Sequence, residues 1–242
     1  MEFLIYFIVL ALLAEIIGTV GGFGSSMLFI PIASYFLDFH VVLGITAIYH
    51  VSSNLSKIYF FKEGFDKKLI LEVGIPSVVF VIIGAFLSKY VPGKTLEFLL
   101  AIFLICLSLL LLIFKNFILK PNTPNSIIGG ALSGFIAGLL GTGGAIRGIV
   151  LSSYNLKPNL FIATSAMIDL GIDVSRSIVY TSNGFLQKKY IYLIPILIVI
   201  SIVGTYIGKR IVNLLTEKQF KTTVLFLILA TGIFTLIKSF NS

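Results

Sequence analysis

The sequence predicts an all-α, polytopic membrane protein with two repeated halves. Of its 242 residues, 57% are hydrophobic and 12% are charged, whereas soluble domains contain roughly 25% charged residues. Apolar runs of about 18 residues or more recur along the whole length, long enough for helices that span a membrane. A glycine-rich phrase also occurs twice, about 120 residues apart, and interrupts an apolar stretch each time. Such paired interruptions are the pattern expected of a transporter's substrate site.

The first half, residues 1–120, contains the phrase Gly18-Thr-Val-Gly21-Gly22-Phe-Gly24. Glycine costs a helix interior up to about 1 kcal/mol relative to alanine, so this phrase predicts a break between two helices. The helix after the break is too short for a comfortable span of about 20 residues, which indicates a short-helix hairpin followed by three transmembrane helices. The apolar segments of this half are 3–21, 24–37, 41–61, 69–89 and 95–115.

The second half, residues 127–242, repeats this order after a polar, proline-rich linker at 121–126. Its own phrase reads Gly138-Leu-Leu-Gly141-Thr-Gly143-Gly144. Its apolar segments are 127–141, 144–154, 160–181, 190–208 and 219–238. Further correspondences at offsets of 119 to 120 are Gly44-Ile-Thr-Ala47 with Ala163-Thr-Ser-Ala166, Pro76 with Pro195, Gly84 with Gly204, and Glu97 with Glu217. The ordered series indicates an internal duplication.

Loop charges distinguish two topologies for the glycine-broken pairs. If each pair counts as one crossing, Lys and Arg divide 8 against 7, and the count decides nothing. If each pair returns to its starting side, ten lie on one side: Lys62, Lys67, Lys68, Lys115, Lys120, Lys157, Lys209, Arg210, Lys218 and Lys221. Five lie on the other: Lys89, Lys94, Lys188, Lys189 and Lys238. The positive-inside rule then predicts a multi-pass inner-membrane protein with both termini extracytoplasmic and inverted halves. It also explains the net charge of +8 without a nucleic-acid partner.

Two of the predicted helices carry matching polar stripes. Segments 41–61 and 160–181 each contain three polar residues at i, i+4, i+7, which places each set on one helical face. The sets correspond position by position: His50 with Asp169, Asn54 with Asp173, and Lys57 with Arg176. Ionisable groups within a bilayer usually face a cavity or a partner because burying them in lipid is costly. An inverted relation between the halves would bring the stripes together near the glycine breaks.

The chemistry around these breaks predicts a site for a small anion. Helix N-termini that follow a break offer free N–H groups and partial positive charge, and the guanidinium of Arg147 is a fork suited to oxyanions. The predicted substrate-binding residues are Gly21, Gly22, Gly24, Ser25, Ser26, Thr46, Asn54, Lys57, Gly141, Gly143, Gly144, Arg147, Ser165 and Arg176. We also expect a coupling proton or cation, because histidine titrates near physiological pH. The candidate coupling residues are His50, Asp169, Asp173 and Glu15.

Each of these features also has a purely structural explanation. Glycines permit close helix packing, and Lys57 and Arg176 lie near enough to segment ends to extend toward lipid headgroups. Asp169 and Asp173 could serve only to neutralise the arginines, and His50 could be an ordinary core histidine.

Other classes of function have less support in the sequence. The chain has two histidines, one cysteine (Cys106) and no His-Glu-x-x-His, so we expect no metal or other cofactor and no embedded enzyme of these kinds. A nucleotide-binding Gly-x-x-x-x-Gly-Lys-[Ser/Thr] loop is also missing, which excludes ATP drive within this chain. An anion channel stays an alternative to a carrier, since both use broken helices. The oligomeric state is left open by the sequence.

The chain resembles the TauE/SafE sulfite-exporter family over essentially its whole length. The resemblance is carried by the repeated glycine phrase, by the helix starts Gly44-Ile-Thr-Ala47 and Ala163-Thr-Ser-Ala166, and by Glu63-Gly64-Phe65-Asp66. It implies a multipass carrier with two repeated halves that handles sulfite, organosulfonates or related small anions. Two positions depart from the family pattern: Leu151 stands where a proline would match Pro31, and Gly184-Phe185-Leu186 lacks the acid of the first-half exit. We therefore expect a secondary transporter that works by alternating access.

Overall fold

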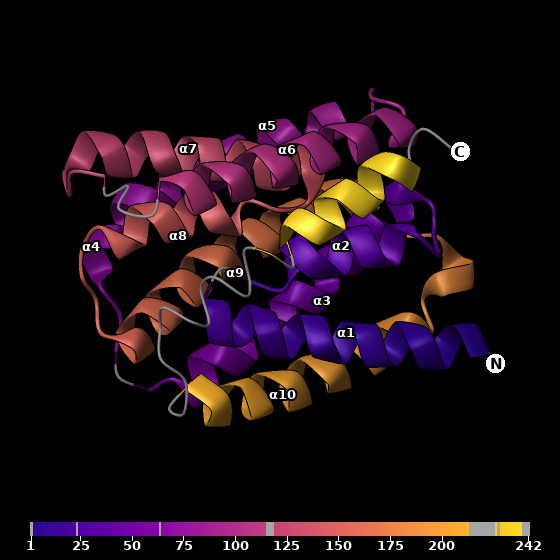
Figure 1. Cartoon of the computed structure of the whole chain (residues 1–242), viewed down its shortest axis with the longest axis horizontal. Coiled ribbons are helices and arrows are strands. Elements are labelled where there is room, and N and C mark those ends of the chain that lie inside the picture. Colours follow the sequence, from indigo (N-terminus) through magenta and orange to yellow (C-terminus); the bar gives the residue numbers. More distant parts are fainter. Residues whose placement is uncertain are drawn as a thin grey trace.

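The computed structural model describes residues 2–22, 24–62, 64–114, 119–212, 226 and 228–238, and the regular secondary structure of this part is entirely helical (Figure 1). Several residues used in the sequence argument lie outside the described part: Glu63, Lys115, Glu217, Lys218, Lys221 and the beginning of segment 219–238. The predicted all-α class is confirmed for the described residues.

The first half folds into a broken hairpin followed by longer helices. In order, its elements are α1 (Glu2–Gly21), α2 (Ser26–Ser34), α3 (Phe39–Phe60), α4 (Lys67–Leu69), η1 (Ile70–Gly74), α5 (Ile75–Ser88) and α6 (Gly93–Ile113). Side chains cap the N-termini of α3 and α4. Asp38 accepts from the His40 N–H at 3.0 Å, and Asp66 accepts from the Leu69 N–H at 3.0 Å. The predicted segment 69–89 is thus a continuous run of α4, the π-helical η1 and α5.

The second half has the same order of elements. They are α7 (Thr123–Leu140), α8 (Gly144–Ser152), α9 (Pro158–Ser182), η2 (Lys188–Tyr190) and α10 (Leu193–Val212), and residues 228–238 are also helical. Asn122 caps α7 by accepting from the Asn125 N–H at 2.9 Å, and Gly141 ends it in the left-handed conformation. Both predicted short helices are present, each nine residues long.

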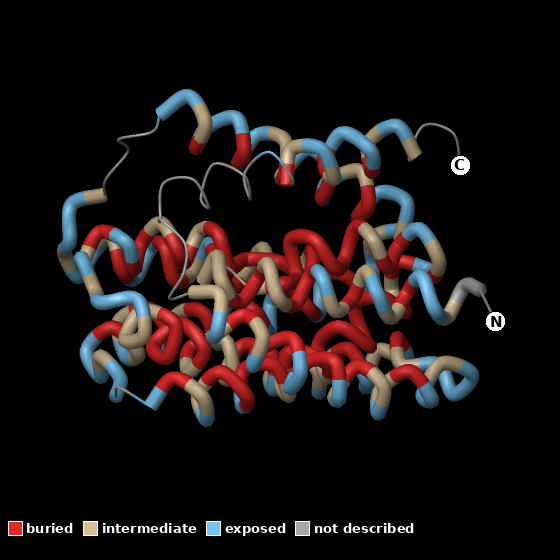
Figure 2. Tube along the Cα trace, turned by 60° about the horizontal axis from the view of Figure 1, so that its bottom comes forward, coloured by how far each residue is buried: buried red, intermediate tan, exposed pale blue. Residues whose placement is uncertain are grey.

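The helices form layers around α3 and α9. Helix α1 packs against α10, and α5 packs against α7, while α3 and α9 pack against each other between these pairs (Figure 1). Buried residues gather between the layers and exposed residues face outward (Figure 2). Among the described helices, five are long and apolar enough to cross a membrane: Leu4–Gly21, Lys67–Ser88, Gly93–Ile113, Thr123–Leu140 and Leu193–Val212. The polar stripes lie on α3 and α9, which the layers enclose.

Each short helix returns toward the end of the bundle from which its hairpin entered. The rings of Phe7 on α1 and Phe36 just after α2 pack edge-on at 6.3 Å between centroids. In the second half, the hydroxyls of Ser126 on α7 and Tyr154 just after α8 lie 2.7 Å apart. Both glycine-broken pairs therefore return to the end of the bundle at which they begin, which is the arrangement assumed in the second count of loop charges.

The two hairpins enter from opposite ends of the bundle. Thr123, at the start of α7, donates to Glu72 near the start of α5 at 2.8 Å. At the other end of α5, the Ser88 carbonyl lies 3.2 Å from Nε2 of His40, which follows the first hairpin. Lys238 donates to the Ser34 carbonyl at 2.5 Å, so the last described helix ends beside the first hairpin. This arrangement agrees with inversion, while the duplication itself and the orientation in the membrane stay predictions.

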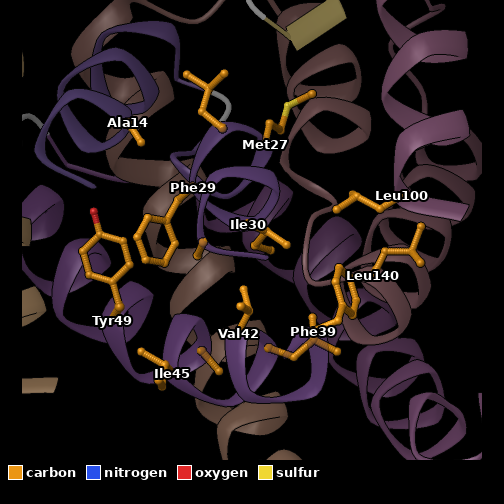
Figure 3. Close-up of a cluster of buried hydrophobic side chains, with 14 of the residues drawn as sticks. Ala14, Met27, Phe29, Ile30, Phe39, Val42, Ile45, Tyr49, Leu100 and Leu140 are labelled. Atoms are coloured by element: carbon orange, nitrogen blue, oxygen red, sulfur yellow. The ribbon is translucent and has the colours of Figure 1, made fainter. Parts of the chain in front are cut away.

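Helix α2 is held by apolar packing on nearly all sides. A nine-residue helix is marginal by itself in water, but Met27, Phe29 and Ile30 are each at most 2% exposed. Figure 3 shows these side chains packed among Val42 and Tyr49 of α3, together with residues of α1, α6 and α7. Tertiary burial thus fixes the position of the first break relative to α3.

Helices α5 and α7 approach so closely that glycine is required between them. A Cβ on Gly134 would overlap the backbone of Ser77, whereas a Cβ on Gly74 would make only an ordinary contact with Ile168 at 3.6 Å. We expect Gly134→Ala to lower the free energy of unfolding by about 1–3 kcal/mol. Gly74→Ala is the matched control, and unfolding in detergent compares the two. Equal stability of both variants would contradict this packing.

Candidate functional site

A cavity lies where the two glycine breaks meet α3 and α9. It contains about 330 Å³ of space between atoms, counting the part that is open to the surroundings. Most of the predicted site residues line it: Gly24, Ser25, Ser26, His50, Asn54, Lys57, Gly141, Gly143, Gly144, Asp169, Asp173 and Arg176. Residues about 120 apart in the chain therefore contribute to one site.

A second cavity lies toward the end of α1 and the start of α9, with about 210 Å³ of space between atoms, again counting the part that is open to the surroundings. Gly24, Asn54, Lys57 and Asp169 line both cavities and form the boundary between them. Of the predicted residues, Gly22 and Ser165 line only this second cavity. Gly21, Thr46, Arg147 and Glu15 line neither of the two described cavities.

Left-handed glycines produce both breaks. Gly24 has φ +86° before α2, and Gly141 has φ +82° at the end of α7, a conformation that residues with a Cβ rarely adopt. The first N–H groups of α2 and α8 have no partner within their own helices, and residues at both helix starts line the cavity. The hydroxyls of Ser26 and Thr142 lie 3.1 Å apart and connect the two breaks directly.

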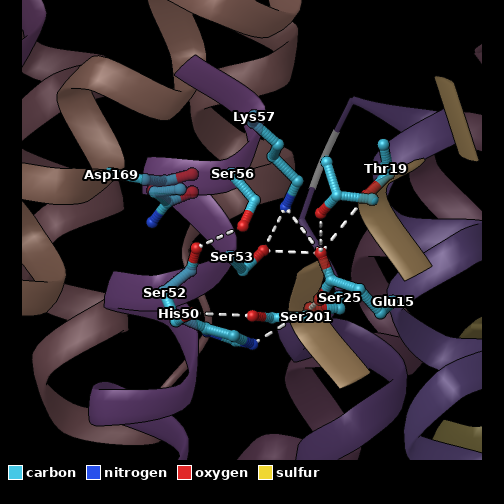
Figure 4. A network of polar contacts seen from close by, with 12 residues as sticks. Glu15, Thr19, Ser25, His50, Ser52, Ser53, Ser56, Lys57, Asp169 and Ser201 are labelled. Atoms are coloured by element: carbon cyan, nitrogen blue, oxygen red, sulfur yellow. Dashed lines mark hydrogen bonds and ion pairs between the residues drawn. The ribbon is translucent and has the colours of Figure 1, made fainter. Parts of the chain in front are cut away.

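Glu15 is the centre of a buried polar cluster behind the cavity wall (Figure 4). Its carboxylate is fully buried and lies 3.2 Å from the Lys57 ammonium. It also accepts hydrogen bonds from Thr19 at 3.3 Å, Ser25 at 2.6 Å, Tyr49 at 2.8 Å, Ser53 at 2.5 Å and Thr205 at 3.1 Å. Every one of these groups donates, which is the environment of an ionised carboxylate.

Four members of this cluster are not among the predicted site residues: Thr19, Tyr49, Ser53 and Thr205. Tyr49 is one of ten tyrosines, and nothing in the sequence distinguishes it. The close packing of α10 around Thr205 could have been predicted, because Gly204 and Gly208 lie on one face of this helix and such pairs permit close helix packing. A Cβ on Gly204 would come within 2.8 Å of the Glu15 side chain, which shows how closely α10 approaches α1.

The two polar stripes meet across the cavity. Asn54 donates to Asp173 at 2.6 Å, and Nη2 of Arg176 lies 3.0 Å from Nδ1 of His50. Arg176 also donates from Nε to Asp173 at 2.6 Å and from Nη1 to the Gly141 carbonyl at 2.5 Å. Arg176 thus joins the end of α7 to a histidine of the first half.

Arg147 is engaged by its own half. Its two terminal nitrogens donate to the two carboxylate oxygens of Asp169, and its Nε donates to Ser165 at 3.1 Å. The side chain is 1% exposed, so the fork predicted for an anion is occupied by Asp169. The structure places Arg147 behind Asp169, and direct contact with a substrate stays a prediction. Thr46 is buried, and its hydroxyl has no hydrogen-bond partner among the described residues.

Each cation in the core has a carboxylate partner. The pairs are Lys57 with Glu15, Arg147 with Asp169, and Arg176 with Asp173. Among the described residues, the side chains therefore leave no excess positive charge at the cavity, and what remains is the partial positive charge of two helix N-termini. Such a site favours a small negatively charged group that can also share Lys57 and Arg176 with their carboxylates.

Comparison with known proteins identifies a family and one relative. The family model described as "Sulfite exporter TauE/SafE" matches residues 7–235. The protein named "Probable membrane transporter protein YdhB" from Bacillus subtilis (strain 168) is 26% identical over 232 residues, which cover 90% of this chain and 93% of that protein. No solved structure matches.

Proposed function

This chain belongs to the TauE/SafE sulfite exporter family and is a multi-pass membrane transporter; from that premise we propose that it carries a small oxyanion or organosulfonate. The carrier is secondary and works by alternating access around the cavity between the two broken hairpins. The substrate is inferred at the level of chemical class: a sulfite-like, sulfonate or short carboxylate anion.

The observation that carries the proposal is the shared cavity of two helix N-termini. The starts of α2 and α8 both line it, one from each half of the chain. A helix N-terminus favours an anion because its first N–H groups and its dipole are directed at the ligand. Two such ends in one buried site support an anion better than a neutral solute, which has no net charge for the dipoles to stabilise.

Lys57 and Arg176 add charge that an anion can share. Both side chains line the cavity, and each is already paired with one carboxylate. Binding would redistribute these contacts and draw the two cations toward the substrate. A buried cation that moves away from its carboxylate needs another negative charge as its partner. The bound anion would supply that charge.

The two halves of the chain supply the moving parts of the proposed cycle. Residues of α3 and α9 meet at the boundary between the two cavities, at Asn54, Lys57 and Asp169. Rocking of one half against the other around this boundary would open the site to one side at a time. The positive-inside rule makes the side with ten basic residues cytoplasmic.

Counterflow in proteoliposomes tests this function. Vesicles are loaded with one unlabelled solute from a panel of sulfite, sulfate, thiosulfate, sulfoacetate, short carboxylates and the zwitterionic sulfonate taurine, and uptake of the same labelled solute is followed. We expect saturable uptake that the internal anion accelerates, with protein-free vesicles as the control. Conductance without counterflow would instead identify a channel, and no flux of any panel anion would contradict the proposed substrate class.

A further inference from the structure

We propose that His50 takes up a proton when an anion binds, so that the transporter moves an anion and a proton together. This inference rests on the proposed function, because it assigns the coupling ion of the same site. It stands on the hydrogen-bond geometry around the imidazole, which connects the anion-facing Arg176 to the Glu15 cluster.

The geometry fixes the state of His50 when the cavity holds no substrate. Arg176 can only donate, so Nδ1 of His50, at 3.0 Å from its Nη2, must be the acceptor and carries no proton. The hydroxyl hydrogen of Ser25 is directed to Glu15 at 2.6 Å. The Ser25 oxygen, 3.1 Å from Nε2, therefore accepts the Nε2–H of His50. His50 is neutral, and both ring nitrogens are in use.

A second proton on His50 is incompatible with this position of Arg176. That proton would have to bind Nδ1 and would point at an Arg176 N–H only 3.0 Å away. Two donors would then face each other, and two positive charges would be in direct contact. Protonation of His50 and its hydrogen bond from Arg176 therefore exclude each other.

An anion in the cavity removes this conflict. Arg176 and His50 both line the cavity, so an anion there can accept the Nη2 hydrogen bond and free Nδ1 for a proton. Its negative charge then stabilises the imidazolium, as does Glu15 beyond Ser25. The proton comes from water on the side to which the cavity is open and returns to water on the other side with the anion. Because each ligand favours the other, their binding is coupled.

The charged side chains around His50 have partners of their own, apart from the contact of Arg176 with the imidazole. Glu15 of α1, Tyr49 and Lys57 of α3, and Asp169, Asp173 and Arg176 of α9 are the titratable side chains of its surroundings in the described part. Glu15, Asp169 and Asp173 are paired with Lys57, Arg147 and Arg176. Lys209 of α10 and Glu97 of α6 are engaged elsewhere, with the Phe60 carbonyl and with Lys238. Arg176 is thus the cation in direct contact with the imidazole.

The test measures protons and anions together in proteoliposomes that contain a pH-sensitive dye. Thiosulfate, sulfoacetate and sulfite are the probes, and entry of each is expected to acidify the lumen by about one proton per anion. His50→Gln is the matched variant, because its amide can accept from Arg176 and donate to Ser25 but cannot titrate. In this variant the remaining anion flux should carry no such proton. Protons carried by sulfite itself are the same in both proteins and cancel in the comparison.

The outcomes separate this inference from the proposed function. Anion counterflow without proton movement in the wild type, or equal proton movement in His50→Gln, overturns proton coupling and leaves the anion carrier standing. Anion flux that depends on a sodium gradient and carries no proton also overturns proton coupling and leaves the anion carrier standing. Absence of counterflow with every panel anion overturns both proposals. If His50→Gln does not fold, His50→Asn replaces it, since its amide oxygen can accept from Arg176 in place of Nδ1.

Discussion

Replacing Lys57 with methionine is expected to lower the free energy of unfolding by about 3–5 kcal/mol, because it leaves the buried Glu15 carboxylate without its cation. Both side chains are at most 7% exposed, so water cannot compensate. Thermal or denaturant unfolding in detergent measures the loss. Lys68→Met is the matched control: Lys68 pairs with Glu72 at 3.7 Å, but its side chain is 71% exposed, and such surface pairs contribute about 0–1 kcal/mol.

A second substitution should restore much of this stability. Glu15→Gln alone leaves Lys57 unpaired, whereas Glu15→Gln combined with Lys57→Met removes both charges. We expect a coupling energy of about 2–3 kcal/mol in the double-mutant cycle. Strictly additive losses would contradict the ion pair seen in the structure.

Transport is expected to be lost in the double variant even though its stability is largely restored. Lys57 is the ammonium that lines both cavities, and a buried anion that is left without a charged donor loses about 3 kcal/mol of binding free energy. Initial counterflow rates at low anion concentration should therefore fall by about a hundredfold or more. Arg210→Met is the control with a lost surface charge, since Arg210 is exposed and contacts the Tyr206 side chain.

Stability and transport of the double variant together distinguish two roles of Lys57, at the cavity and as the partner of Glu15. A double variant that is both stable and inactive assigns the loss to the missing charge at the cavity. A double variant that transports at the wild-type rate would show that Lys57 serves only to neutralise Glu15. That result would favour the structural explanation of the polar stripe.

The sequence predicted those features that depend on periodicity and on backbone preference. The stripes of α3 and α9 follow from helical spacing, and Asn54 does meet Asp173 across the halves. The breaks follow from glycine, and Gly24 and Gly141 have the left-handed φ values that a break needs. These predictions used local rules, which hold whatever the rest of the chain does.

Which polar side chains pair with each other in the core could not be predicted in the same way. Which carboxylate meets Arg147 depends on the rotation and depth of α8 relative to α9, and no spacing rule fixes either. Glu15 lies behind Ser25 rather than on the cavity wall for the same reason. Thr205 joins that cluster only because α10 packs tightly on α1. Contacts between distant elements are determined by packing as a whole.

Chemical labelling at the start of α2 tests most directly whether the cavity is an anion site. In a Cys106→Ala background, Ser26→Cys places one thiol on the cavity wall, and Ser182→Cys places the control thiol on the exposed end of α9. We expect a sulfonate-bearing methanethiosulfonate reagent to modify Ser26→Cys faster than its trimethylammonium analogue, and sulfoacetate or another unreactive transported anion to slow that reaction, with neither effect at Ser182→Cys. Equal rates for both reagents at Ser26→Cys, or no protection by any transported anion, would contradict an anion site between the two glycine-broken hairpins.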